Sequence, residues 1–338
     1  MPRCGRGIGM QQWQPQQGRS GRHRRGSRRR RLRWGRLLAV AAGFTVLLFG
    51  LVKLIGYGMD LISSRQAANK LQAIYYAAPT ETPIAVTPEP TALPTPVPTP
   101  TETAAPTPSP APAQSPIPRL AALAYPQNPK LQISSRFKAL RKESKDIVGW
   151  LSIHRMLDEA VTQRDNVYYL DHDATGNSNV NGALFLDSAI GLKTRPYTYI
   201  IYGHNMKNGT MFGSLRNYEN STFYHNDPFI TFDTLYESGR YVIFAAGSVS
   251  TEEHGNNYVD FFSLRSANIP ERQAAIDVLI SASVHTCTVD VQADDQLLVL
   301  VTCVEKDEER RVVVARRIRE DEDEAELKKL VQKSRKKQ

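Results

Sequence analysis

The chain has 338 residues, 41% of them hydrophobic, and a formal net charge of +9 at pH 7. This length suits one large domain or two small ones. The positive charge is local, because residues 1–36 hold twelve arginines and no acid, which leaves 31 basic and 34 acidic residues in the rest. The overall charge therefore gives no support for a nucleic-acid-binding domain, and a basic RNA-binding tail is the weaker interpretation of residues 1–36.

An apolar segment follows the arginines. Residues 37–59 are long enough to cross a bilayer if Lys53 extends its ammonium toward the headgroups. Trp34 and Tyr57 stand where interfacial aromatic residues are expected. The pattern predicts a single-pass membrane anchor, with the arginine-rich tail (1–36) in the cytoplasm and the rest of the chain outside. The alternative is a cleaved signal peptide, for which the apolar run is long.

Two segments separate the predicted anchor from the predicted folded domain. Residues 60–76 have apolar positions at helical spacing and should continue the helix outward. Residues 77–118 consist largely of Pro, Thr and Ala, a composition that cannot bury a core and favours extended polyproline II. At about 3.1 Å per residue, this linker would hold a domain on the order of 100 Å from the membrane.

The folded domain is predicted over residues 119–319 and is mostly β. An amphipathic helix is expected over 130–145, and a second helix, with Pro270 in its first turn, over 270–284. Short apolar runs bounded by turn residues predict a barrel or a sandwich, with strands at 147–153, 166–170, 183–186, 197–202, 241–246, 297–302 and 311–318. The charged C-terminal tail, 320–338, is expected to form an exposed, partly frayed helix.

The cysteines indicate a nucleophile rather than a disulfide framework or a zinc site. There are only three, and none lies in a Cys-x-x-Cys pattern. Cys303 ends an apolar strand and is followed at once by polar residues, so that its thiol can open onto a cleft. Cys287 lies in an alternating pattern in mid-strand, where packing without reactivity is the better interpretation.

A histidine and an arginine complete the predicted constellation. His204 lies in a Gly-His-Asn turn directly after the apolar strand that ends at Tyr202, in a position to act as general acid and base. Arg310 and Arg311 stand at the entrance of the last strand, where one guanidinium can stabilise an oxyanion. Only one of them can face the cleft, because side chains alternate between the faces of a strand.

The sequence around Cys303 resembles that of a known enzyme family. Val-Leu-Val-Thr-Cys at 299–303 is similar to the Thr-Leu-x-Thr-Cys motif of sortases, with Val299 in place of the first threonine. The segment 202–215, which begins Tyr-Gly-His-Asn, closely resembles the histidine segment of class B sortases. Other segments that resemble class B members lie at 146–151, 166–170, 182–187 and 270–284. Together the resemblance covers roughly residues 130–318.

The resemblance implies a closed sortase-type β-barrel of about eight strands, with an N-terminal helix and a helix inserted before the cysteine strand. It also implies a cysteine transpeptidase that needs no metal or organic cofactor. Cys303 would attack the threonine carbonyl of a sorting signal such as Asn-Pro-x-Thr or Leu-Pro-x-Thr-Gly in a secreted protein. His204 would protonate the departing amine, and an amino group of peptidoglycan or its lipid-linked precursor would resolve the thioacyl intermediate.

The choice between the two arginines stays open within this resemblance. Matching Arg-x-Val-Val-Val favours Arg310, seven residues after Cys303, whereas the commoner longer spacing favours Arg311. Strand register should govern which side chain meets the cleft, so Arg310 is preferred. Thr302 is expected to orient the substrate or the arginine, and Glu305 lies where some class B members have an acid.

Two other functions are weighed against wall anchoring. A catalytically silent, membrane-tethered module that holds sorting signals or wall peptides is favoured only by Val299 and the arginine spacing. A sortase that polymerises pilins would use a lysine of another subunit as acceptor. No lid-like insertion ahead of the first strand favours it, although the linker could conceal one.

Overall fold

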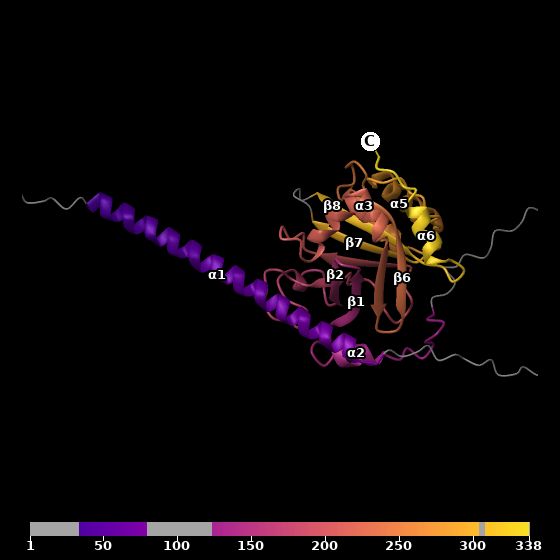
Figure 1. Cartoon of the computed structure of the whole chain (residues 1–338), viewed down its shortest axis with the longest axis horizontal. Coiled ribbons are helices and arrows are strands. Elements are labelled where there is room, and N and C mark those ends of the chain that lie inside the picture. The colour runs from indigo at the N-terminus through magenta and orange to yellow at the C-terminus, as the bar shows by residue number, and fades with distance from the viewer. Residues whose placement is uncertain (1–33, 80–123, 304–307, 338) are drawn as a thin grey trace, which may run out of the picture. The chain divides into compact units, whose positions relative to one another are not determined.

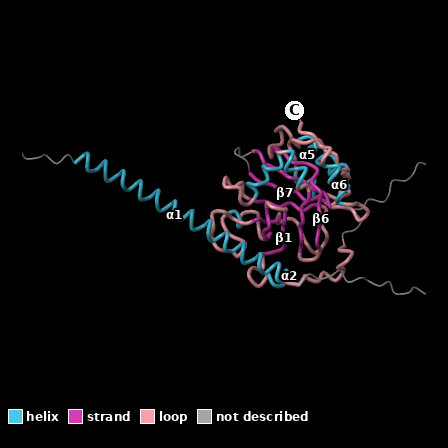
Figure 2. Tube along the Cα trace, viewed as in Figure 1, coloured by secondary structure: helices cyan, strands magenta, loops and turns pink. Residues whose placement is uncertain are grey.

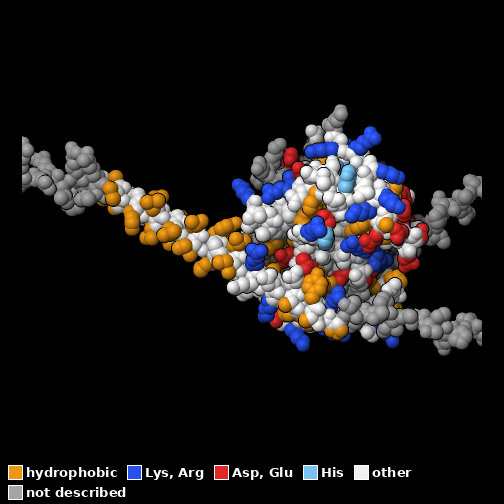
Figure 3. Space-filling view, in the orientation of Figure 1, with side chains coloured by type: hydrophobic (Ala, Val, Ile, Leu, Met, Phe, Trp, Pro, Cys, Tyr) orange, Lys and Arg blue, Asp and Glu red, His pale blue; other side chains and the backbone are white. Residues whose placement is uncertain are grey.

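The computed structural model describes residues 34–79, 124–303 and 308–337. Contacts divide the chain into two units, residues 1–53 and 54–338. One continuous helix, α1 (Trp34–Ala77), covers both the predicted anchor and the predicted juxtamembrane helix. It is long and apolar enough to cross a membrane, and its apolar side chains from Leu38 to Ile62 are largely exposed (Figure 3).

The second unit contains a closed eight-stranded barrel, as the sequence predicts (Figures 1 and 2). Around the barrel the strands follow the order β1-β2-β3-β4-β7-β8-β6-β5. Their bounds are β1 (Ile147–Ile153), β2 (Leu157–Thr162), β3 (Leu184–Leu186), β4 (Thr198–Gly203), β5 (Phe229–Thr234), β6 (Ser238–Ser250), β7 (Leu297–Cys303) and β8 (Glu309–Arg317).

The pairing of β4 with β7 sets the geometry of the site. These two strands are parallel, although most other pairs in the barrel are antiparallel. Residues 297–301 of β7 are all at most 1% exposed, so both faces of the strand are covered. A strand buried on both faces reads as a continuous apolar run rather than an alternation, which explains the Leu-Leu-Val-Leu-Val sequence here.

The helices agree with the sequence in part. Helix α5 (Ile269–Ala282), with Pro270 in its first turn, confirms the helix predicted before the cysteine strand. Helix α2 (Ser135–Leu140) is shorter than the predicted 130–145. The remaining short helices are α3 (Ser221–Asn226), α4 (Phe261–Arg265), α6 (Glu324–Val331) and the 3₁₀ helices η2 (Tyr168–Leu170) and η3 (Phe212–Glu219).

The predicted strand at 166–170 is wrong. The carboxylate of Asp165 accepts hydrogen bonds from the backbone N–H groups of Val167 (2.9 Å) and Tyr168 (2.6 Å). Such an aspartate-centred turn starts the 3₁₀ helix η2 and overrides the β propensity of the Val-Tyr-Tyr run. Strands β2 and β5 are additional to those predicted, and Asp158 and Glu159 interrupt the apolar pattern of β2.

The C-terminal half of α1 packs into the barrel unit. Leu71 and Tyr75 are 2% and 4% exposed and belong to the same buried core as the strands. The Tyr75 ring stacks on Trp150 of β1, with centroids 4.3 Å apart, and its hydroxyl donates a hydrogen bond to Asp233 of β5. Residues 71–75 of α1, which belong to the same unit as the barrel, therefore contact the barrel directly. Residues 80–118 of the linker lie outside the described residues, so its expected span of about 100 Å stays a prediction.

The C-terminal helix also packs against the barrel. Asp323 caps α6 by accepting hydrogen bonds from the N–H groups of Ala325 and Glu326. Its Leu327 and Val331 are 3% and 0% exposed, so the expectation of an exposed helix is wrong for this face. The acidic-then-basic order of its charges, which suits the helix dipole, is present as predicted.

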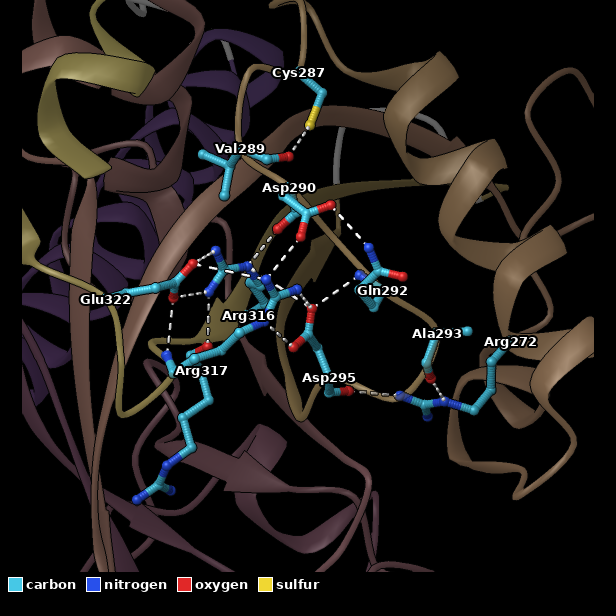
Figure 4. Close-up of polar contacts among 11 residues, drawn as sticks. Arg272, Cys287, Val289, Asp290, Gln292, Ala293, Asp295, Arg316, Arg317 and Glu322 are labelled. Carbon is cyan, nitrogen blue, oxygen red and sulfur yellow. Dashed lines mark hydrogen bonds and ion pairs between the residues drawn. The ribbon is translucent and has the colours of Figure 1, made fainter. Parts of the chain in front are cut away.

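Two buried arginines hold the loop that leads into β7 (Figure 4). Arg272 of α5 donates hydrogen bonds to the carbonyl groups of Ala293 (2.7 Å) and Asp295 (3.0 Å). Arg316 of β8 donates to the carbonyl of Asp290 (2.6 Å) and forms an ion pair with Glu322. Both side chains are fully buried, and they satisfy carbonyl groups that would otherwise be left unpaired. They therefore fix where the cysteine strand begins.

Candidate active site

The strand register brings the three predicted catalytic positions together. Strands β4 and β7 run parallel and end at the same end of the barrel, where Gly203 pairs with Thr302. His204 therefore leaves β4 beside the end of β7, which is Cys303 as predicted. On the other side of β7, Cys303 pairs with Arg310 of β8. Strand β4 and the much later pair β7 and β8 thus bring these three positions to the same end of the barrel.

The same register separates the two arginines. Arg311 pairs with Thr302, and successive residues of a strand point to opposite faces. The Arg311 side chain is bound to η3, since its Nε donates to Glu219 Oε1 at 3.0 Å and its Nη2 lies 2.9 Å from the same oxygen. Thr302 is buried on the Arg311 side of the strand. Glu305, the predicted accessory acid, lies outside the described residues.

The imidazole of His204 is held by a backbone carbonyl. Its Nε2 lies 2.6 Å from the carbonyl oxygen of Leu170, at the end of η2. A carbonyl oxygen only accepts hydrogen bonds, so Nε2 carries the proton in this contact. Gly203 is tightly packed, because a Cβ there would approach the side chains of Leu184 (2.5 Å) and Phe212 (2.9 Å). This close packing around the end of β4 fixes the position of the backbone from which the His204 side chain extends.

A polar network lies next to Arg310. The Tyr202 hydroxyl donates to Asp187 Oδ2 at 3.1 Å, and Arg265 Nη1 donates to Asp187 Oδ1 at 3.1 Å. Burial and the negative charge of Asp187 raise the pKa of Tyr202, whereas the charges of Arg265 and Arg310 oppose that rise. Phe262 stands 66% exposed, with the Arg265 guanidinium 5.5 Å from its ring centroid. The site therefore combines a fixed positive charge, a buried carboxylate and an exposed aromatic ring.

Several parts of this site were not predicted from the sequence. Asp187 falls within a segment that resembles class B sortases, but nothing local shows its partners Tyr202 and Arg265. Leu170 contributes only its carbonyl oxygen, which any residue possesses. A backbone acceptor leaves no mark in the choice of amino acid, so only the fold identifies it.

The second cysteine of the folded domain has the environment of a packed thiol. Cys287 lies in a loop after α5 rather than in the predicted strand, and its Sγ–H donates to the carbonyl of Val289 at 3.3 Å (Figure 4). Burial raises the pKa of this thiol, the direction opposite to that of an activated nucleophile. Among the described residues, no group of three or more His, Cys, Asp or Glu side chains is placed to hold a metal ion.

Comparison with known proteins agrees with this geometry. The family model for the Sortase domain matches residues 157–318. Sortase B of Staphylococcus aureus is 31% identical over 192 residues, which span 55% of this chain and 75% of that protein. The chain belongs to the sortase family, in class B. Like other members, this class B sortase is a cysteine transpeptidase that acts on sorting signals and uses an amino nucleophile.

Solved structures of class B sortases share the barrel. A Bacillus anthracis protein described as similar to sortase B superposes with a TM-score of 0.56 at 23% identity, over 76% of this chain and 96% of that one. A sortase B complexed with triglycine has a TM-score of 0.50 at 29% identity, over 57% of this chain and 89% of that one. The fold of this sortase is thus that of its class.

Proposed function

We propose that this class B sortase is anchored in the cell membrane, with its amino terminus in the cytoplasm, and joins secreted proteins to the cell wall. Its substrates carry C-terminal sorting signals of the Asn-Pro-x-Thr or Leu-Pro-x-Thr-Gly kind. The observation that supports the assignment most strongly is the register that sets Cys303 between His204 and Arg310. The arginine-rich tail and the apolar part of α1 support the anchor and its orientation.

In the first half of the reaction, the Cys303 thiolate attacks the carbonyl carbon of the threonine in the sorting signal. The resulting oxyanion is stabilised by the Arg310 guanidinium. The C–N bond then breaks, His204 gives a proton to the departing amine, and a thioester joins the substrate to Cys303. Because Nε2 of His204 is bound to the Leu170 carbonyl, we assign this proton to Nδ1.

In the second half, an amino group attacks the thioester carbonyl. His204 Nδ1 accepts a proton from the incoming amine, the C–S bond breaks, and the Cys303 thiolate leaves. The acceptor we propose is an amino group of peptidoglycan or of its lipid-linked precursor. The complex of a related sortase B with triglycine, a peptide with a free amino end, supports an acceptor of this chemistry.

The experiment that tests the function is mass spectrometry of the full chain, in detergent, after incubation with sorting-signal peptides. An acyl adduct on Cys303 in the wild type, and none in Cys303→Ala, is the expected result. The matched control is Cys287→Ala, which should keep the adduct because the mechanism does not use that thiol.

Other outcomes would change the assignment. A folded wild type that binds these peptides but forms no adduct would make the chain a silent binding module. An adduct that is resolved only by a lysine of a second substrate protein, giving lysine-linked oligomers, would show pilin polymerisation instead of wall anchoring. An adduct resolved by a glycine peptide or another small wall amine would support the proposed acceptor.

A further inference from the structure

The juxtamembrane part of α1 is hydrogen-bonded to the loop between η2 and β3. Asn179 of this loop donates from Nδ2 to the Asp60 carbonyl (2.9 Å) and to Ser63 Oγ (3.0 Å) of α1. Asn181 Nδ2 donates to Ser64 Oγ at 3.2 Å. Both asparagines are 2% exposed, although they stand in a loop. This contact is therefore built into the molecule rather than being a chance meeting of surface groups.

Asn179 also organises the loop from within. Its Oδ1 accepts hydrogen bonds from the N–H of Asn181 (3.0 Å) and from Asn181 Nδ2 (2.9 Å). Its backbone N–H donates to the carbonyl of Asp171 (2.8 Å), the residue that follows Leu170. Its backbone carbonyl accepts from the N–H of Gly182 at 3.0 Å. Asn179 is thus bound to α1 through its side chain and, through its backbone, to the two chain segments that flank His204.

Gly182 shows how closely these segments approach the imidazole. Its φ is +62°, in the region that favours glycine. A Cβ at this position would lie 2.5 Å from the Tyr169 carbonyl oxygen and 2.9 Å from that of Leu170. It would also lie 3.2 Å from Cδ2 of His204. The carbonyl that binds His204 Nε2 therefore cannot shift without moving the segment 179–182, and the reverse holds as well.

We propose that Asn179 is a positioning residue for His204, and that α1 takes part in catalysis by holding Asn179. The path runs from Asp60 and Ser63 to Asn179, and from there through Asp171 to the Leu170 carbonyl. The inference rests on the proposed function, in which His204 Nδ1 transfers the proton. A helix that leads to the membrane then also sets the orientation of the acid and base.

The decisive variant is Asn179→Ala in the full chain, measured in detergent with a sorting-signal peptide and a glycine acceptor. Misplacement of an acid or base by about 1 Å costs up to about 100-fold in rate. We expect kcat to fall about tenfold or more with little change in KM, since Asn179 lies behind His204. In histidine-labelled protein, the NMR signal of the His204 Nε2–H, assigned with His204→Gln, should change or disappear.

Gln72→Ala is the matched control. It removes another hydrogen bond between α1 and the barrel, from Gln72 to Asp158 of β2, which does not involve the His204 loop. We expect it to lower stability by an amount similar to Asn179→Ala but to leave kcat and the His204 signal unchanged. Equal losses of kcat in the two variants would overturn the proposal, because the effect would then be one of stability alone.

The double variant Ser63→Ala and Ser64→Ala tests the path from the helix side. It leaves the loop sequence intact and favours the helix, since alanine has the higher helix propensity. A smaller loss of kcat than in Asn179→Ala is expected, because the Asp60 carbonyl still accepts from Asn179. An unchanged kcat would contradict the part of the proposal in which the Ser63 hydroxyl helps to hold Asn179, even if Asn179→Ala does not fold. A wild type that forms no acyl adduct would instead count against the proposed function.

Discussion

The two ends of the barrel use arginine in different ways. At the end where β7 begins and β8 finishes, Arg316 is fully buried. Its guanidinium donates a hydrogen bond to the Asp290 carbonyl and forms an ion pair with the Glu322 carboxylate. At the end where β7 finishes and β8 begins, Arg310 lies opposite Cys303 and donates to the carbonyl of its own neighbour, Glu309. A guanidinium surrounded by protein acceptors is structural, whereas one set beside a nucleophile can stabilise charge in a reaction.

Arg311 shows how finely this distinction is drawn. It is adjacent to Arg310 in the sequence but is bound to Glu219 of η3, and so resembles the structural arginines of the far end. The alternation of strand side chains separates the two roles within one dipeptide. The following predictions concern the end of the barrel that holds Cys303, the opposite end that holds Arg316, and strand β2 in the side of the barrel.

The largest effect is expected at the site end. Arg310→Ala should lower kcat by about 100- to 1,000-fold, as the loss of an oxyanion donor does. Arg311→Ala should leave kcat nearly unchanged and lower the free energy of unfolding by about 1 kcal/mol or less, because it removes a partly exposed ion pair. Steady-state kinetics with a sorting-signal peptide and thermal unfolding measure the two effects. The opposite ranking of the two kcat values would show that the register argument is wrong.

At the far end the effect should fall on stability. Arg316→Met takes the guanidinium away from the buried Asp290 carbonyl and, among the described residues, leaves the Glu322 carboxylate with Arg319 alone. Removing one partner of a buried ion pair typically costs about 3–5 kcal/mol of the free energy of unfolding. Denaturant unfolding measures this loss. The kcat of the folded protein, corrected for the folded fraction, should equal that of the wild type. A large fall in kcat at full folding would mean that the two ends are coupled.

A smaller effect than at either end of the barrel is expected at Glu159, in strand β2. Burial, with a contribution from Asp158, raises the pKa of Glu159 to about 7 from an ordinary value of 4.5. Between these pH values the folded state binds more protons than the unfolded state, so the free energy of unfolding falls as pH rises. Glu159→Gln removes this loss and should stabilise the protein by on the order of 2 kcal/mol at pH 8, with little effect below pH 4.5. Thermal unfolding at both pH values checks it, and equal stabilisation at both would contradict the raised pKa.

The places of Cys303 and His204 at strand ends could be predicted because their patterns are local. Cys303 closes an apolar run, and His204 follows a strand and a glycine, so each was identified at a strand end without knowledge of its partners. The choice between Arg310 and Arg311 could only be argued from register, because both stand at the entrance of β8. The pairing of Cys303 with Arg310 and the contact of Arg311 with Glu219 agree with the choice of Arg310. The catalytic role of Arg310 stays a prediction.

The errors arose where one segment depends on another. The run at 166–170 has the composition of a strand, but a single aspartate before it starts a 3₁₀ turn. Nothing in the sequence around Tyr75 indicates that its ring stacks on Trp150, which joins this part of α1 directly to the barrel. The charged tail seemed solvated, but Leu327 and Val331 supply an apolar stripe that the barrel covers.

The sequence by itself determined the apolar helix, most of the strands, and a cysteine and a histidine at strand ends. These follow from hydrophobic pattern and turn chemistry, which act over a few residues. The tertiary structure alone decided which arginine meets Cys303, which carbonyl holds His204, and that α1 lies against the loop behind it. The first depends on strand register, and the second on a backbone carbonyl, which every residue has and which leaves no trace in the sequence. The third depends on two asparagines whose partners lie more than 100 residues away in the chain.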